Sequence, residues 1–190
     1  VGLAHHSISC YNERKKQEME RRKGGTEMSK IELRKAETGD EKVLAHIQTE
    51  SWKSAFGGIL SPEELERCTD IQKAEAMYKR FLERGSVHMT IEFIDQKPHC
   101  IAGWSQNRND LGANTAELIC IHSLADKRHQ GYGSLMMEHV LNEMKQAGYS
   151  EVVLWVFEKN ITAIKFYEKH GFSVMENGAA IQICNLSEEK

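Results

Sequence analysis

The stretch "KRHQGYGSLMMEHVLNEM" constrains the fold of this chain most, because two glycines stand at the start of an amphipathic helix. The apolar run at 118–124 predicts a strand leading into these glycines, and 134–147 predicts the helix leading out. The first amide groups of a helix lack internal partners and lie at the positive end of its dipole. A strand-to-helix turn of this kind can therefore hold a phosphate through backbone N–H groups.

Several readings of the glycine pair compete. A P-loop is excluded, because no Gly-Lys-Ser/Thr follows the glycines. A dinucleotide fingerprint needs a small residue three positions after the second glycine, where this chain has Met136. The glycines could also merely relieve strain in a loop. What remains to be explained is the pattern R-x-x-G-x-G, formed by Arg128, Gly131 and Gly133.

Composition excludes several classes of protein. The 190 residues, of which 40% are hydrophobic, suffice for one domain with a core. A net charge of -3 gives no basic footprint for nucleic acid. Five cysteines without a CxxC pair indicate a reducing compartment, and no His/Cys cluster has metal-ligand spacing. No apolar run approaches the roughly 20 residues of a membrane helix. We expect a cytoplasmic protein with no nucleic-acid, membrane or metal site.

The first residues do not resemble a folded domain. Residues 1–27 are polar and charged, without helical or strand periodicity, and Gly24-Gly25 would interrupt a helix. We expect 1–27 to be a flexible tail, or the product of a start codon assigned too far upstream, and 28–190 to be a single domain.

The order of elements along 28–190 is strand, helix, helix, antiparallel meander, helix, strand, helix and hairpin. Thr38 and Glu41 predict a capping box at the first helix, and Ser61-Pro62 predicts the start of a second helix over 63–84. The nearly continuous apolar run at 152–157 is typical of a strand covered on both faces. Asn177-Gly178 predicts the turn of the closing hairpin.

Two motifs at the expected separation resemble the GNAT superfamily of N-acetyltransferases. The first is the R-x-x-G-x-G turn between the fourth strand and the long helix. The second is the segment "NITAIKFYEKHGF", with Asn160, Ala163, Phe166, Tyr167, Gly171 and Phe172. The chain departs from the family pattern at Ala125, where proline is common, and at His129 and Gln130, where glycine and lysine are common.

The resemblance implies an α/β (α+β) fold of the GNAT type. It implies a mixed, mostly antiparallel sheet of about seven strands, flanked by about four helices and splayed between strands 4 and 5. The implied cofactor is acetyl-coenzyme A, with its pyrophosphate at the glycine turn and its pantetheine arm along the fourth strand. The implied cofactor-binding residues are Ile121, His122, Ser123, Arg128, His129, Gln130, Gly131, Tyr132, Gly133, Ser134 and Asn160.

The resemblance also assigns catalytic roles. Tyr167 would protonate the leaving thiolate, and Glu117 would accept the proton of the amine through water. Asn160 has a second reading as a helix N-cap, and a water chain is the alternative to Glu117. His122 suits a base by its chemical type, but strand alternation favours a structural role. Trp52 and Phe56 lie where the family builds its acceptor pocket, although a tryptophan at a helix end is also typical of core packing.

The implied activity is transfer of the acetyl group to a primary amine, by direct attack in a ternary complex. The acceptor would be a small molecule or a peptide N-terminus. The alternative is a coenzyme A-binding sensor or interaction module without transfer activity. Homodimers are frequent in the family, so a homodimer is compatible with the resemblance.

Overall fold

The structure is a computed structural model and describes residues 29–108, 111–174 and 181–185, with side chains up to residue 174. The described residues from Ile31 onward form one compact unit. The predicted tail at 1–27 and the predicted turn at Asn177-Gly178 lie outside the described residues.

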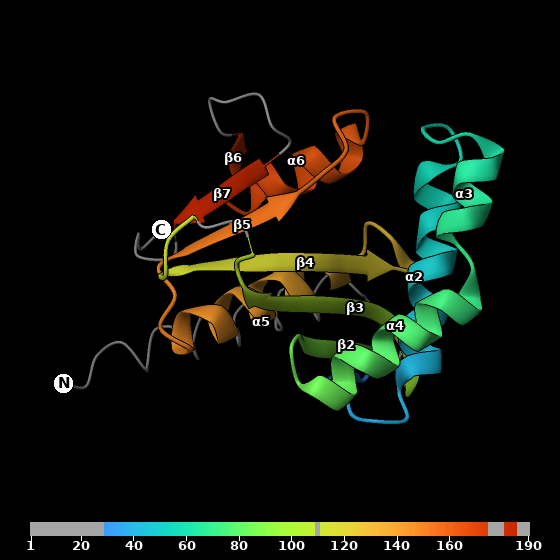
Figure 1. The fold of residues 1–190 in the computed structure, drawn as a ribbon, viewed down its shortest axis with the longest axis horizontal. Coiled ribbons are helices and arrows are strands. Elements are labelled where there is room, and N and C mark those ends of the chain that lie inside the picture. Colours follow the sequence, from blue (N-terminus) through green and yellow to red (C-terminus); the bar gives the residue numbers. More distant parts are fainter. Residues whose placement is uncertain (1–28, 109–110, 175–180, 186–190) are drawn as a thin grey trace. The chain divides into compact units, whose positions relative to one another are not determined.

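In the described residues, seven strands form one sheet in the order β1-β2-β3-β4-β5-β7-β6 (Figure 1). Neighbouring strands are antiparallel, except that β4 and β5 are parallel. This arrangement confirms the predicted mixed, mostly antiparallel sheet. The strands are β1 (Ile31–Lys35), β2 (His88–Ile94), β3 (Lys97–Gln106), β4 (Thr115–Ser123), β5 (Glu151–Trp155), β6 (Ser173–Val174) and β7 (Ile181–Asn185).

The described chain has five α-helices, one more than the four or so predicted, because the helix predicted over 63–84 is interrupted. Thr69 ends its first part, and the Asp70 carboxylate accepts hydrogen bonds from the backbone N–H groups of Gln72 and Lys73, which starts a new helix. The helices are α2 (Glu41–Phe56), α3 (Pro62–Cys68), α4 (Ile71–Arg84), α5 (Tyr132–Gln146) and α6 (Ile161–Lys169), with a 3-10 turn η1 (Ala125–Lys127) before α5.

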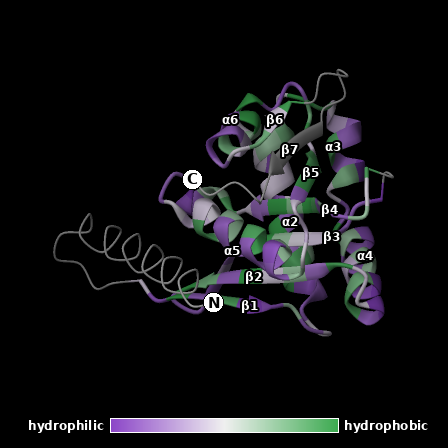
Figure 2. Cartoon of the chain, turned by 90° about the vertical axis from the view of Figure 1, so that its left-hand side faces the viewer, coloured by the Kyte–Doolittle hydropathy of each residue, from purple (hydrophilic) through white to green (hydrophobic). Residues whose placement is uncertain are grey.

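Two buried clusters, which we call the α2 core and the α5 core, hold the helices against the sheet. Tyr78 on α4 donates a hydrogen bond to Gln48 on α2 at 2.6 Å, and Trp104 on β3 donates one to Glu143 on α5 at 3.1 Å. Figure 2 shows hydrophobic residues along one side of α4 and hydrophilic ones along the other. The α2 core contains Ala36, Leu44, Ala45, Ile47, Ala74, Tyr78, Val87, Met89, Ile91 and Ile101. The α5 core contains Cys100, Ala102, Trp104, Ala116, Leu118, Met136, Met137, Val140, Met144, Val152, Leu154 and Phe172.

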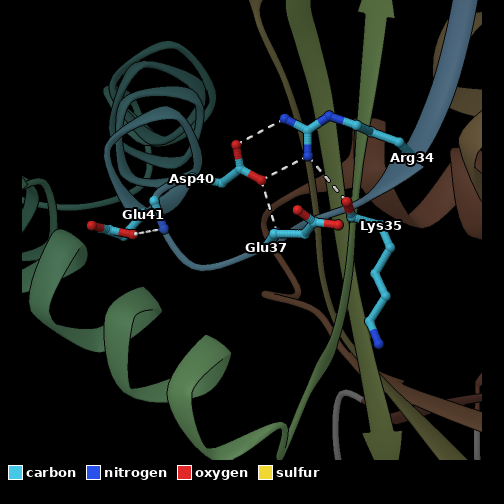
Figure 3. A network of polar contacts seen from close by, with 6 residues as sticks. Arg34, Lys35, Glu37, Asp40 and Glu41 are labelled. Atoms are coloured by element: carbon cyan, nitrogen blue, oxygen red, sulfur yellow. Dashed lines mark hydrogen bonds and ion pairs between the residues drawn. The ribbon is translucent and has the colours of Figure 1, made fainter.

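The start of α2 differs in detail from the predicted capping box. The N-cap residue is Asp40, and its carboxylate binds both terminal nitrogens of Arg34 on β1, at 2.7 and 2.8 Å (Figure 3). Glu41 instead accepts a hydrogen bond from the backbone N–H of Gly39. Hydrogen bonds from Arg34 lower the pKa of Asp40, so this carboxylate stays ionised and ties the helix start to the sheet edge.

Candidate active site

The sheet opens between β4 and β5, as predicted. Only Thr115–Leu118 of β4 pair with β5, while the pairing with β3 continues to Ser123. The register between β3 and β4 shifts at Gly103/Trp104, where Gly103 lies opposite Cys120 and Trp104 opposite Leu118. Ile119 is therefore the extra residue of a β-bulge. From Ile119 onward, the β4 backbone has no β5 partner, which leaves polar backbone groups facing the gap.

The predicted phosphate-binding turn joins β4 to α5. It comprises η1, the residues 128–130 and the N-cap Gly131, whose φ of 95° is a conformation that favours glycine. Side chains of Ser61, Asp70 and Asn160 cap α3, α4 and α6, whereas α2 and α5 have no side-chain cap. His129, Gln130 and Gly131 are exposed. The start of α5 thus has the geometry of an anion site built from main-chain groups.

Side chains around this turn are engaged elsewhere. Arg128 donates a hydrogen bond to Ser54 Oγ on α2 at 2.9 Å and to the carbonyl oxygen of Ser123 at 3.4 Å. Tyr132 is buried, with its ring 5.6 Å from the His99 ring between centroids. At the predicted phosphate-binding turn, the backbone of the motif residues therefore remains available to a ligand, while these two side chains make contacts within the protein. The Arg128 side chain links the turn to α2.

The two glycines of the motif serve different purposes. Gly131 is required for its positive φ, whereas Gly133 lies inside α5 beneath the ring of Phe166. A Cβ at position 133 would be 3.6 Å from Phe166 Cε2, an ordinary van der Waals distance. Phe166 on α6 thus packs over the start of α5 with room for a methyl group at position 133, and this contact connects the two sequence motifs in space.

Tyr167 follows Phe166 on α6 and is half-buried. It packs against the α5 core together with Ile121 from the unpaired part of β4. Burial raises the pKa of Tyr167 above its ordinary value, and the nearby Cys120 thiol raises it further. The phenol therefore stays protonated and remains a hydrogen-bond donor. Asn160 accepts a hydrogen bond from the N–H of Ala163 at 3.2 Å, so its N-cap role is confirmed.

Glu117 is buried on the paired part of β4, opposite Ser105 and Val153. Its carboxylate accepts hydrogen bonds from Arg108 Nε at 2.9 Å and from Arg108 Nη2 at 2.5 Å. Hydrogen bonds from Arg108 lower the pKa of Glu117 below its ordinary value. The pairing therefore opposes proton uptake by this carboxylate. Arg108 was not predicted as a partner, although it lies nine residues before Glu117, across a predicted turn.

Four rings gather at the open part of the sheet, on the side of α2. The centroid of Trp52 lies 4.7 Å from that of Phe56 and 6.5 Å from those of His122 and Phe157. Burial lowers the pKa of His122 to about 4, so its imidazole is neutral near pH 7. The structure thus brings together Trp52 and Phe56, the two residues predicted to line the pocket for the acetyl acceptor. Phe157 was not predicted, because its approach to α2 is a long-range contact.

A cavity of about 540 Å³ lies between α2 and the segment after β4, beside the Arg128–Ser54 hydrogen bond. Its lining includes both acidic and basic side chains, so the cavity does not favour a ligand of one particular charge. The lining residues are His46, Glu50, Lys53, Ser54, Leu124, Ala125 and Asp126.

Two further properties concern only the part of the chain that the structure describes. None of its helices combines the length and the apolar character needed to cross a bilayer. Its His, Cys, Asp and Glu side chains form no group of three or more suited to a metal ion.

Comparison with known proteins identifies the family. The model of the acetyltransferase (GNAT) family matches residues 47–172, about two thirds of the chain. This chain therefore belongs to the GNAT family, and it is an acetyl-coenzyme A-dependent N-acetyltransferase.

Individual relatives support the same assignment. Spermidine N(1)-acetyltransferase of Thermoplasma acidophilum is 27% identical over 145 residues, which is 76% of this chain and 89% of that protein. N-alpha-acetyltransferase 50 of Danio rerio is 32% identical over 106 residues, which is 54% of this chain and 60% of that protein.

A solved structure shares the fold. PaiA N-acetyltransferase from Thermoplasma acidophilum, in complex with coenzyme A, superposes with a TM-score of 0.72 at 24% identity, covering 82% of this chain and 99% of that one.

Proposed function

We propose that this enzyme transfers the acetyl group of acetyl-coenzyme A to the primary amine of a small molecule, in a ternary complex. The observation that carries the proposal is the unpaired stretch of β4, which leads directly into the uncapped start of α5. Main-chain groups of Ile121, His122 and Ser123 would hold the pantetheine arm, and the turn from Arg128 to Ser134 would hold the pyrophosphate. This placement positions the thioester in the gap between β4 and β5.

The amine nitrogen attacks the thioester carbonyl carbon, and a β4 amide donates to the oxygen that becomes negative. The C–S bond then breaks, and Tyr167 donates its phenolic proton to the departing sulfur. Solvent takes the proton of the amine, directly or through a water chain, and later reprotonates Tyr167. We assign Glu117 the role of anchoring the β3–β4 connection, because Arg108 already holds its carboxylate.

The name of the Thermoplasma relative supports a small amine as acceptor. A peptide N-terminus is the second candidate, supported by the relative named N-alpha-acetyltransferase 50. A thiol-release assay with acetyl-coenzyme A and separate panels of small amines and peptides tests the proposal. We expect release of free coenzyme A with at least one small primary amine, accompanied by an acetylated product in the mass spectrum. Release that requires a peptide would contradict the proposed acceptor class.

A further inference from the structure

The four rings at the open part of the sheet form what we call the aromatic cluster, defined as Trp52, Phe56, His122 and Phe157. They come from α2, from β4 and from the segment after β5. Besides the contacts of Trp52, the centroids of Phe56 and Phe157 lie 5.3 Å apart in a T-shaped arrangement. These separations fall within the range at which aromatic rings attract one another.

Part of this aromatic surface is open to solvent. Phe157, a member of the cluster, is 46% exposed. His122 lies on the part of β4 that has no β5 partner. An apolar group that covers this exposed aromatic surface removes it from water, and this burial has a favourable free energy.

The carboxylates on the neighbouring elements are already engaged. Glu50 on α2 pairs with Lys53 at 2.7 Å, Glu117 on β4 pairs with Arg108, and Glu151 on β5 accepts a hydrogen bond from Thr115 Oγ1 at 3.1 Å.

Other carboxylates lie on or next to these elements. Asp126, just after β4, is exposed and lines the cavity beside α2. Glu41, at the far end of α2, binds the N–H of Gly39. Glu158, next to Phe157 in sequence, is exposed, and an exposed carboxylate attracts an ammonium group only weakly. Among the described residues, the cluster itself thus offers ring faces, and the carboxylates on its elements are either paired, hydrogen-bonded or exposed.

We infer that the acceptor is a primary monoamine whose apolar group, an aromatic ring or an alkyl chain, lies against the aromatic cluster. The inference deepens the proposed function and rests on it. Ring faces attract a cation, but they do not replace the several hydrogen bonds with which water solvates each additional ammonium group of a polyamine. A monoamine exposes only its reactive nitrogen to this desolvation, which lowers the pKa of the ammonium and favours the neutral form that attacks.

The test compares phenethylamine and hexylamine with spermidine as acceptors for the enzyme at saturating acetyl-coenzyme A. We expect kcat/KM for phenethylamine to exceed that for spermidine by roughly tenfold or more. In Phe157→Ala, we expect kcat/KM for phenethylamine to fall about tenfold, mainly through KM, because the variant loses the ring that the bound acceptor would cover. Phe157→Leu should recover part of this loss. Val174→Ala, which shortens another exposed side chain on β6, is the matched control and should leave kcat/KM unchanged.

The outcomes are distinguishable. If spermidine is the better acceptor, the inference is overturned while the proposed function stands. If Phe157→Ala lowers kcat/KM equally for phenethylamine and spermidine, the ring supports the fold instead of recognising the acceptor, and the inference is also overturned. If no amine of the panel releases coenzyme A, the proposed function itself fails.

Discussion

Arg108 and Glu117 form a bidentate ion pair that joins the end of β3 to the beginning of β4. The two side chains differ in exposure: the Glu117 side chain is 1% exposed, and the Arg108 side chain is 64% exposed. The backbone N–H of Arg108 also donates to Glu117, at 3.3 Å. Glu117 is therefore a buried anion. Among the described residues, its only charged partner is a side chain that is itself largely exposed to solvent.

We expect Arg108→Ala to destabilise the protein more than Glu117→Gln. The first change leaves a carboxylate buried without its cation, at a cost of up to about 3–5 kcal/mol, whereas the second leaves an arginine that water can solvate. Urea denaturation of both variants measures the difference. Glu117→Gln should keep kcat within about threefold of the unmodified enzyme; a fall of roughly 10²-fold would return Glu117 to the role of general base.

The pair also predicts a pH dependence. Because the pKa of Glu117 is lowered in the folded protein, its contribution to stability is present above the pKa of the unfolded chain. This contribution is lost as the pH falls through the folded pKa. Acid titration followed by circular dichroism should therefore show a smaller acid destabilisation in Glu117→Gln.

The second prediction separates the two glycines of the motif. Gly131→Ala places a Cβ on a residue with φ of 95°, which costs about 1–2 kcal/mol and displaces the turn. Gly133→Ala meets Phe166 only at van der Waals distance. We expect calorimetry to show weaker acetyl-coenzyme A binding for Gly131→Ala and binding within about threefold of the original for Gly133→Ala. Equal losses in both variants would refute this division of roles.

The third prediction concerns Gly103, opposite the β-bulge. A Cβ at this position would overlap Met89 Sδ and lie 3.3 Å from Cys120 Sγ. Since Met89 is buried, we expect Gly103→Ala to cost about 1–3 kcal/mol. Combining it with Met89→Ala should cost less than the sum of the two single changes, because the methyl group then fills vacated space. Strict additivity in a double-mutant cycle would show that the two side chains do not compete.

The fourth prediction follows from Glu92 on β2. Both oxygens of its carboxylate are buried without a hydrogen-bond partner, and burial raises its pKa from 4.5 to about 8. Between these values, the folded protein keeps a proton that the unfolded chain releases, so the free energy of unfolding falls as the pH rises. We expect Glu92→Gln to flatten this slope in urea titrations at several pH values between 5 and about 8.5. An unchanged slope would show that Glu92 is already ionised.

Local patterns predicted the parts of this fold that depend on neighbours in sequence. The periodicity of α5 and the glycine at its N-cap were sufficient to locate the turn, and the apolar run of β5 indicated a central strand. The break between α3 and α4 was missed, because Asp70 continues a helical pattern until its carboxylate is seen to bind two backbone N–H groups.

The arrangement of the site depends on long-range contacts and on a β-bulge, which the alternation of polar and apolar residues along a strand does not predict. A bulge at Ile119 shifts the register of β4 by one residue, so the side of the sheet reached by His122 could not be derived from a regular period of two. Trp52 and Phe157 are more than a hundred residues apart in sequence, and only the packing of α2 near the end of β5 brings them together.

The central claim is that Tyr167 protonates the departing thiolate, and Tyr167→Phe tests it most directly. The variant keeps the ring that packs near Phe166 and Phe172, so its melting temperature and its affinity for acetyl-coenzyme A should be unchanged. Tyr149→Phe, which removes a hydroxyl from a ring packed against Trp104, is the matched control. With the best acceptor, we expect kcat of Tyr167→Phe to fall by roughly 10²-fold or more while the control keeps its rate. A Tyr167→Phe enzyme that turns over at the unmodified rate would contradict the account.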